Sequence, residues 1–221
     1  RPFVRPIRLK GSMNRPRPWP KGAFLGLVGW CLTALLAIPS TVAAEPVVRP
    51  NVLILYHGGV QAAGADALTH ATTPDVNVER IAQALEEEFL SLGARVVRKP
   101  IEQITSPGQL RGFEAILLGS PVWFSNMSWP MKRFFDTTLY QVYIQESNRL
   151  RGTLMSAFCT VMESGVSGPR ALEAIQGGME HVSDRVLPGL VIQTSWSEAQ
   201  WRPAVRAFAQ RIQKACRREQ P

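Results

Sequence analysis

Short, uninterrupted apolar runs alternate along this chain with longer segments of helical periodicity. Val52–Tyr56 is one such run, closed by His57 and two glycines, and Ala115–Leu118 is a second, closed by Gly119-Ser120. Runs without polar alternation are typical of strands buried on both faces, as in a parallel sheet. Between these two runs, the apolar residues of the segment 78–92 recur at helical spacing.

The alternation continues to the C-terminus and predicts the fold class. Strands that alternate regularly with helices are the pattern of an α/β doubly wound sheet, with parallel strands and helices on both faces. In such sheets ligands bind at the carboxyl ends of the strands. The predicted strands span residues 52–56, 95–98, 115–120, 154–160 and 189–193, and the predicted helices span 78–92, 126–137, 169–186 and 198–217.

The net charge of +8 and the sequence pI near 10.0 come mostly from the N-terminal segment. Residues 1–44 carry seven basic side chains and no acidic one, whereas residues 45–221 carry 18 basic and 17 acidic side chains. Binding to nucleic acid needs clustered positive charge. We therefore predict no nucleic-acid partner for the remainder of the chain.

Residues 13–44 follow the order of a secretory signal peptide. Met13 is the predicted start, residues 1–12 being an upstream extension, and basic residues, an uncharged apolar run over 23–38 and small residues up to Ala44 follow it. We predict cleavage near Ala44, which leaves a domain of residues 45–221 in a bacterial periplasm or another exported location. The alternative is an uncleaved anchor in the inner membrane, although the run is shorter than the ~20 residues of a typical span.

Few side chains in the domain suggest catalysis or metal binding. Cys159 and Cys216 have no CxxC or metal-ligand spacing, and we predict two unpaired thiols and no metal site. His57, at the end of the first strand, faces the expected ligand crevice and is the one candidate for proton transfer. A hydrogen-bonded loop residue is the simpler interpretation of this lone histidine.

The stretch after the third predicted strand carries the most informative motif. It runs Gly-Ser-Pro-Val-Trp-Phe over 119–124 and continues through Asn126-Met127 to Met-Lys-Arg-Phe-Phe-Asp over 131–136. This stretch of about twenty residues resembles the flavodoxin-like superfamily, and within it the flavin-dependent NAD(P)H:quinone oxidoreductases of the tryptophan-repressor-binding-protein type. The resemblance implies a five-stranded sheet in the order 2-1-3-4-5 and FMN as the cofactor.

The resemblance assigns the FMN contacts to three loops at the carboxyl ends of strands. Trp123 or Phe124 can stack on the isoalloxazine ring, while backbone N–H groups after Pro121 bond its polar edge. Hydroxyl groups and a helix N-terminus would hold the phosphate without basic side chains. The implied contacts are Thr72, Thr73 and Asn77 in the first loop, Ser120, Pro121, Val122, Trp123, Phe124 and Asn126 in the second, and Thr160, Glu163 and Gly165 in the third.

The first loop departs from the family pattern. The family has Ser/Thr-x-Thr-Gly-Asn-Thr between strand and helix, whereas this chain has His57-Gly58-Gly59, an insertion of about fifteen residues, and then Thr72-Thr73-Pro74-Asp75. The Asp75 carboxylate would repel a phosphate dianion. The sequence Thr73-Pro74-Asp75 is also typical of a helix start, with a capping residue, proline and an acid in succession.

Two classes of function follow from these observations. The first is an exported FMN-binding redox protein, either an electron carrier or an NAD(P)H-dependent quinone or flavin reductase, with a small molecule or protein as electron donor and acceptor. In that chemistry the flavin performs the electron and hydride steps. The second is a flavodoxin-like interaction module that has lost FMN, with the inserted residues 60–71 contacting a partner.

Overall fold

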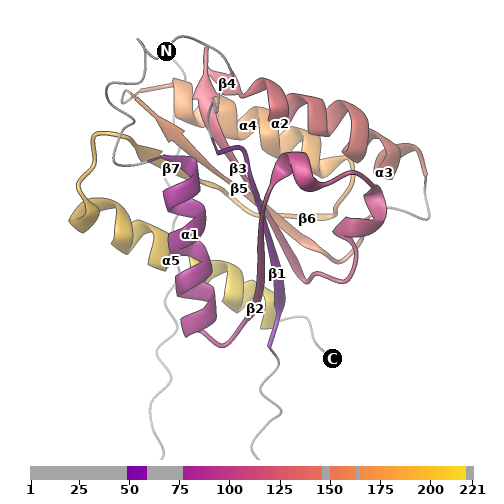
Figure 1. The fold of residues 1–221 in the computed structure, drawn as a ribbon, viewed down its shortest axis with the longest axis horizontal. Coiled ribbons are helices and arrows are strands. Elements are labelled where there is room, and N and C mark those ends of the chain that lie inside the picture. Colours follow the sequence, from indigo (N-terminus) through magenta and orange to yellow (C-terminus); the bar gives the residue numbers. More distant parts are fainter. Residues whose placement is uncertain (1–48, 59–76, 146–149, 163–164, 218–221) are drawn as a thin grey trace, which may run out of the picture. The chain divides into compact units, whose positions relative to one another are not determined.

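The computed structural model describes residues 49–58, 77–145, 150–162 and 165–217, which form a parallel β-sheet with helices on both faces (Figure 1). The strands are β1 (Asn51–Tyr56), β2 (Arg95–Pro100), β3 (Ala115–Trp123), β4 (Asn126–Met127), β5 (Leu154–Val161), β6 (Arg185–Val186) and β7 (Leu190–Gln193). The helical segments are α1 (Val78–Ser91), the short turns η2 (Ile101–Gln103) and η3 (Pro107–Leu110), α2 (Trp129–Phe134), the π-helical turn η4 (Phe135–Leu139), α3 (Tyr140–Ile144), α4 (Ser167–Glu180) and α5 (Glu198–Arg217).

The sheet confirms the predicted class and strand order. Its strands lie in the order β2-β1-β3-β5-β6, all parallel along this path, and β7 also pairs in parallel with β5. The fifth place in the sheet, where the sequence predicted one strand over residues 189–193, is thus shared by β6 and β7. These two strands are separated by Leu187-Pro188-Gly189. Together with the small antiparallel strand β4, this gives seven strands rather than five.

The central strands are buried and mostly apolar because helices cover both sides of the sheet. Val52 and Ile54 of β1 belong to the core formed with α1 and α5. Leu53 and Leu55, which point the other way, belong to the core formed with α2, α3 and α4. The interpretation of the uninterrupted apolar runs as strands buried on two faces is therefore correct.

The helix predicted over residues 126–137 begins later and ends later than expected. Asn126 and Met127 pair with β3, and the helix starts at Trp129, with Ser128 as its N-cap and Pro130 in the first turn. It then continues through η4 and α3 to Ile144. The predicted start was wrong because cross-strand pairing, a nonlocal interaction, takes the first two residues.

A second boundary also differs from the prediction. The helix predicted over residues 169–186 ends at Glu180, and Arg185–Val186 form β6 instead. The hydroxyl of Ser183 donates to the carbonyl of Thr153 and accepts from the N–H of Arg185, which directs the chain into the sheet.

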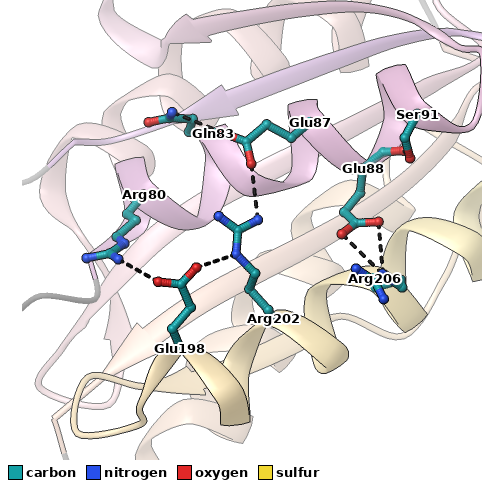
Figure 2. Close-up of polar contacts among 8 residues, drawn as sticks. All are labelled: Arg80, Gln83, Glu87, Glu88, Ser91, Glu198, Arg202 and Arg206. Carbon is teal, nitrogen blue, oxygen red and sulfur yellow. Dashed lines mark hydrogen bonds and ion pairs between the residues drawn. The ribbon is translucent and has the colours of Figure 1, made fainter.

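Charged side chains connect the exposed edges of α1 and α5 (Figure 2). Arg202 of α5 contacts both Glu198, at 2.5 Å, and Glu87 of α1, at 3.1 Å, and Arg80 reaches Glu198 at 3.1 Å. Solvent reaches about half of each of these side chains, so each pair contributes little to stability. Their common effect is to favour one alignment of the two helices over their shared apolar core.

The two cysteines lie on opposite faces of the sheet. Cys216 belongs to the core beneath α1 and α5, and Cys159 to the core beneath α2 to α4. Burial raises the pKa of the Cys159 thiol to about 12.

Among the described residues, no helix is both long enough and apolar enough to cross a membrane.

The adjacent glycines of α4 provide a matched test of how closely this helix approaches the π-helical turn. A β-carbon at Gly178 would lie 2.2 Å from Cε1 of Phe135, whereas one at Gly177 would meet no heavy atom within 4 Å. We expect Gly178→Ala to destabilise the domain by about 1–3 kcal/mol through overpacking. Gly177→Ala should stabilise it by up to about 1 kcal/mol through helix propensity. Urea unfolding measures both, and equal shifts would contradict the close approach.

Candidate functional site

The motif after the third strand forms a hairpin that extends the sheet at its carboxyl edge. β3 stays paired with β5 as far as Pro121 and then turns back as β4, with Val122 opposite Met127 and Trp123 opposite Asn126. Phe124 and Ser125 alone connect the two strands. Sequence reasoning missed this hairpin because its turn lacks the usual Asn-Gly or Asp-Gly signal.

Both turn residues adopt left-handed backbone conformations. The φ angle of Phe124 is 49° and that of Ser125 is 61°, as a two-residue turn of type I′ requires. For a bulky L-residue this region costs about 1–2 kcal/mol, and such strain concentrates at functional sites. The phenyl ring of Phe124 is fully exposed, so its own packing does not offset the strain.

Other apolar side chains are exposed near this hairpin. The hydroxyl groups of Ser125 and Ser167, the first residue of α4, are 3.0 Å apart and link the turn to that helix. Val166 precedes the helix with 63% of its surface exposed, and Met162, which follows β5, is 79% exposed. With Trp123 and Phe124 they make an apolar surface at the carboxyl ends of β3 and β5, which we call the strand-end patch.

A chain of buried hydrogen bonds lies below this patch. The backbone N–H of Ser128 donates to the hydroxyl oxygen of Ser120 at 2.9 Å, and the two hydroxyls are 3.2 Å apart. The Ser128 hydroxyl in turn lies 3.0 Å from Nδ1 of His57. These contacts fix the N-terminus of α2 against the ends of β1 and β3.

His57 is buried between these hydrogen-bonded serines and the carboxylate of Glu102. Its Nε2 lies 3.9 Å from Oε1 of Glu102, and its ring meets the ring of Trp123 edge-on, with centroids 5.6 Å apart. Burial lowers the pKa of His57 below its ordinary value, and the Glu102 carboxylate partly offsets that effect. Burial therefore favours the neutral form of the imidazole.

Glu102, His57 and Ser128 together have the residue types of a hydrolytic triad, which their spacing in sequence gave no reason to expect. A nucleophilic hydroxyl must reach a substrate, however, and Ser128 is completely buried. Its hydroxyl is already engaged by Ser120 and His57. We therefore interpret this arrangement as a structural hydrogen-bond chain, with His57 as the member closest to the strand-end patch.

The N-terminus of α1, which the resemblance places at the FMN phosphate, is capped by side chains of this chain. Asn77 is the N-cap of α1, and its side-chain oxygen accepts the N–H of Arg80 at 2.8 Å. Glu79, in the first turn, accepts from the hydroxyl of Tyr56 at 3.1 Å. A β-carbon at Gly58 would lie 3.6 Å from Oε2 of Glu79, so this carboxylate stands beside the start of the first loop.

The remaining predicted contacts are placed as follows. Thr160 is buried at the end of β5, Gly165 has a φ of 135°, and the Asn126 side chain accepts its neighbour's N–H at Met127. Thr72, Thr73 and Glu163 lie outside the described residues. Within the ranges that the structure describes, no group of three or more His, Cys, Asp or Glu side chains is placed to hold a metal ion.

The fold defines a class of protein: a doubly wound α/β domain, here with the strand-end patch at the carboxyl ends of its central strands. No family model matches the sequence. Solved structures with the same arrangement are flavodoxins and related proteins, so the chain has the flavodoxin-like fold.

Three of these similar structures illustrate the match. Flavodoxin 1 of Bacillus cereus is 13% identical with a TM-score of 0.56, and the match covers 74% of this chain and 97% of that one. A flavodoxin of Streptococcus pneumoniae TIGR4 is 11% identical with a TM-score of 0.57, and the match covers 75% of this chain and 99% of that one. A WrbA-like protein of Agrobacterium tumefaciens is 16% identical with a TM-score of 0.53, and the match covers 77% of this chain and 99% of that one.

The buried imidazole of His57 should make stability depend on pH. Because the pKa of His57 is lowered in the folded chain, the unfolded chain takes up a proton first as the pH falls. The contribution to stability is complete above the unfolded pKa of about 6.5 and is lost as the pH falls through the folded pKa. Between pH 7 and pH 5, urea unfolding should therefore show a smaller loss in the free energy of unfolding for His57→Gln than for the unaltered chain.

Glu102→Gln provides the matched variant for this experiment. It removes the carboxylate that favours the charged imidazole, and so it should lower the pKa of His57 further. The loss of stability should then continue to a lower pH than in the unaltered chain. A loss that ends at a higher pH would contradict the assigned electrostatic role of Glu102.

Proposed function

We propose that this chain binds FMN noncovalently at the strand-end patch and transfers electrons. The observation that carries the proposal is the strained hairpin, which holds Trp123 and a fully exposed Phe124 at the edge where doubly wound sheets bind ligands. A bulky residue held in a left-handed turn, with its ring in solvent, is explained by a ligand that covers the ring. The flavodoxins with the same fold support the assignment.

The side chains of the strand-end patch fit the ring system of a flavin. Trp123 and Phe124 offer aromatic surface, and Met162 and Val166 extend the apolar area beside them. When bound, the flavin would supply hydride and one-electron transfer chemistry. The residues of this chain would then exclude water from the ring, and the buried ring of His57 would support the Trp123 indole through their edge contact.

The phosphate end supports a second candidate function. Glu79 places a carboxylate beside Gly58, and Asn77 already caps α1 with its side-chain oxygen. A negative charge at this position disfavours a phosphate dianion. The alternative is an interaction module without FMN, in which the strand-end patch and residues 60–71 contact a partner instead.

The location and the redox partners stay predictions. Residues 13–44, outside the described residues, support export with or without cleavage near Ala44. A free nicotinamide donor is scarce outside the cytoplasm by general expectation. We therefore favour electron transfer with a protein or small-molecule partner over NAD(P)H-dependent reduction.

Phe124→Gly separates the role of the phenyl ring in binding from its effect on folding. Glycine tolerates the left-handed turn, so the variant should be more stable in urea unfolding by about 1 kcal/mol. Loss of ring stacking, worth about 0.5–1.5 kcal/mol, should weaken FMN about two- to tenfold. Titration of the purified chain with FMN, followed by flavin fluorescence, measures the affinity.

Leu90→Ala serves as the control, because Leu90 is an exposed apolar residue near the C-terminal end of α1. It should leave FMN affinity unchanged. A chain that is purified without a flavin spectrum and does not bind added FMN would refute the proposal and favour the interaction module.

Comparison of FMN with riboflavin tests the phosphate end. If the predicted contacts Thr72 and Thr73 hold the phosphate, their joint replacement by alanine should weaken FMN by about 1–3 kcal/mol through the loss of charge-assisted hydrogen bonds. Riboflavin, which has no phosphate, should bind the variant as it binds the unaltered chain. Equal affinities for the two flavins in the unaltered chain would show that the phosphate is not recognised.

A further inference from the structure

A cavity of about 360 Å³ lies between the helical stretch α2-η4-α3 and α4, on one face of the sheet. Figure 1 shows these helices running beside each other. Their packing leaves the cavity open to solvent, and its volume falls within the usual range for small-molecule sites. None of the residues that line it belongs to the strand-end patch.

The π-helical turn explains why so many side chains of one helical stretch face this cavity. The lining residues form two rows with a spacing of four, Lys132, Asp136 and Tyr140 in one and Phe135, Leu139 and Tyr143 in the other. In a regular α-helix, positions eight residues apart differ by about 80° around the axis. The wider turn of a π-helix, with its i→i+5 hydrogen bond from the N–H of Tyr140 to the carbonyl of Phe135, reduces this rotation and keeps both rows on one face.

The opposite wall is shaped to match. Gly178 of α4 has no side chain where the Phe135 ring lies, since a β-carbon there would be 2.2 Å from the ring. One turn earlier, Ala174 presents a small side chain at the exposed margin of the cavity. Gly178 therefore lets the Phe135 ring pack closely against α4, while the small side chain of Ala174 leaves the margin of the cavity open.

The chemistry of the walls selects for a neutral aromatic ligand. Phe135, Tyr140 and Tyr143 are joined by His181, whose ring meets that of Tyr143 nearly edge-on at a centroid distance of 5.6 Å. Lys132 and Asp136 form an ion pair with each other, so they contribute no net charge. Aromatic rings favour further edge-to-face or offset contacts, and the tyrosine hydroxyls and the imidazole supply polar partners.

From these features we infer that the cavity is a second ligand site, which binds a flat aromatic compound of one or two rings carrying a hydroxyl group. The rings lie among Phe135, Tyr140 and Tyr143, and the hydroxyl meets the polar groups of these tyrosines and of His181. The cavity shares no residue with the strand-end patch, so ligand binding there does not require FMN.

Fluorescence titration with 2-naphthol tests the inference on the full chain. In water, excited 2-naphthol loses its proton and shows a second emission band at longer wavelength, so transfer to the cavity should suppress that band. Naphthalene serves as the comparison ligand that lacks the hydroxyl. We expect saturable binding of 2-naphthol and at least about tenfold weaker binding of naphthalene, corresponding to one good hydrogen bond.

Ala174→Leu and Glu173→Leu form the matched pair of variants. Both positions are exposed neighbours on α4, but only Ala174 lines the cavity. Ala174→Leu should weaken 2-naphthol at least about tenfold by filling the margin, while Glu173→Leu should bind like the unaltered chain. Leucine is a good helix former at both positions, and circular dichroism verifies that both variants fold.

Each other outcome overturns the inference. No saturable binding, or equal effects of the two variants, removes the site. Equal binding of naphthalene and 2-naphthol removes the assignment of a hydroxyl-bearing ligand. If light scattering finds a dimer that Ala174→Leu dissociates and Glu173→Leu does not, the cavity is filled by a second copy of the chain instead of a small molecule.

Discussion

The structure depends on the length of its central strand, β3, which extends beyond the end of its neighbour β1. β3 has nine residues, and its pairing with β1 ends at Gly119 while its pairing with β5 ends at Pro121. Beyond Pro121 the backbone N–H and C=O groups of β3 have no partner in β1 or β5, so they need new hydrogen-bond partners. The antiparallel strand β4 provides them, and the hairpin that results places the exposed aromatic rings above the ends of the parallel strands.

How much of this follows from the sequence depends on the range of the interaction that decides each feature. The strands covered on both faces follow from uninterrupted apolar runs, and α5 follows from its periodicity over 198–217. The hairpin at Phe124 and Ser125 does not, because pairing within the fold imposes a conformation that neither residue favours on its own. The contact of His57 with Ser128 joins residues 71 positions apart, and no local pattern encodes it.

The start of α1 is a second place where local patterns and tertiary structure diverge. A helix N-terminus attracts anions through its unpaired N–H groups and its dipole. Here the side-chain oxygen of Asn77 already accepts one of these groups, and the Glu79 carboxylate adds negative charge to the first turn. The helix is thus stabilised without any ligand. A phosphate at this end would have to be recognised mainly by the loop that precedes α1.

The hydrogen bonds at Ser128 connect the two candidate sites. They fix Ser128, the N-cap of the stretch α2-η4-α3, against Ser120 and His57, at the edge that carries the strand-end patch. The same stretch continues through the π-helical turn to form one wall of the cavity beside α4. Its orientation is set at the start by a buried polar anchor and farther along by the close approach of Phe135 to Gly178. A single helical segment, held at two points, therefore determines the geometry of both surfaces.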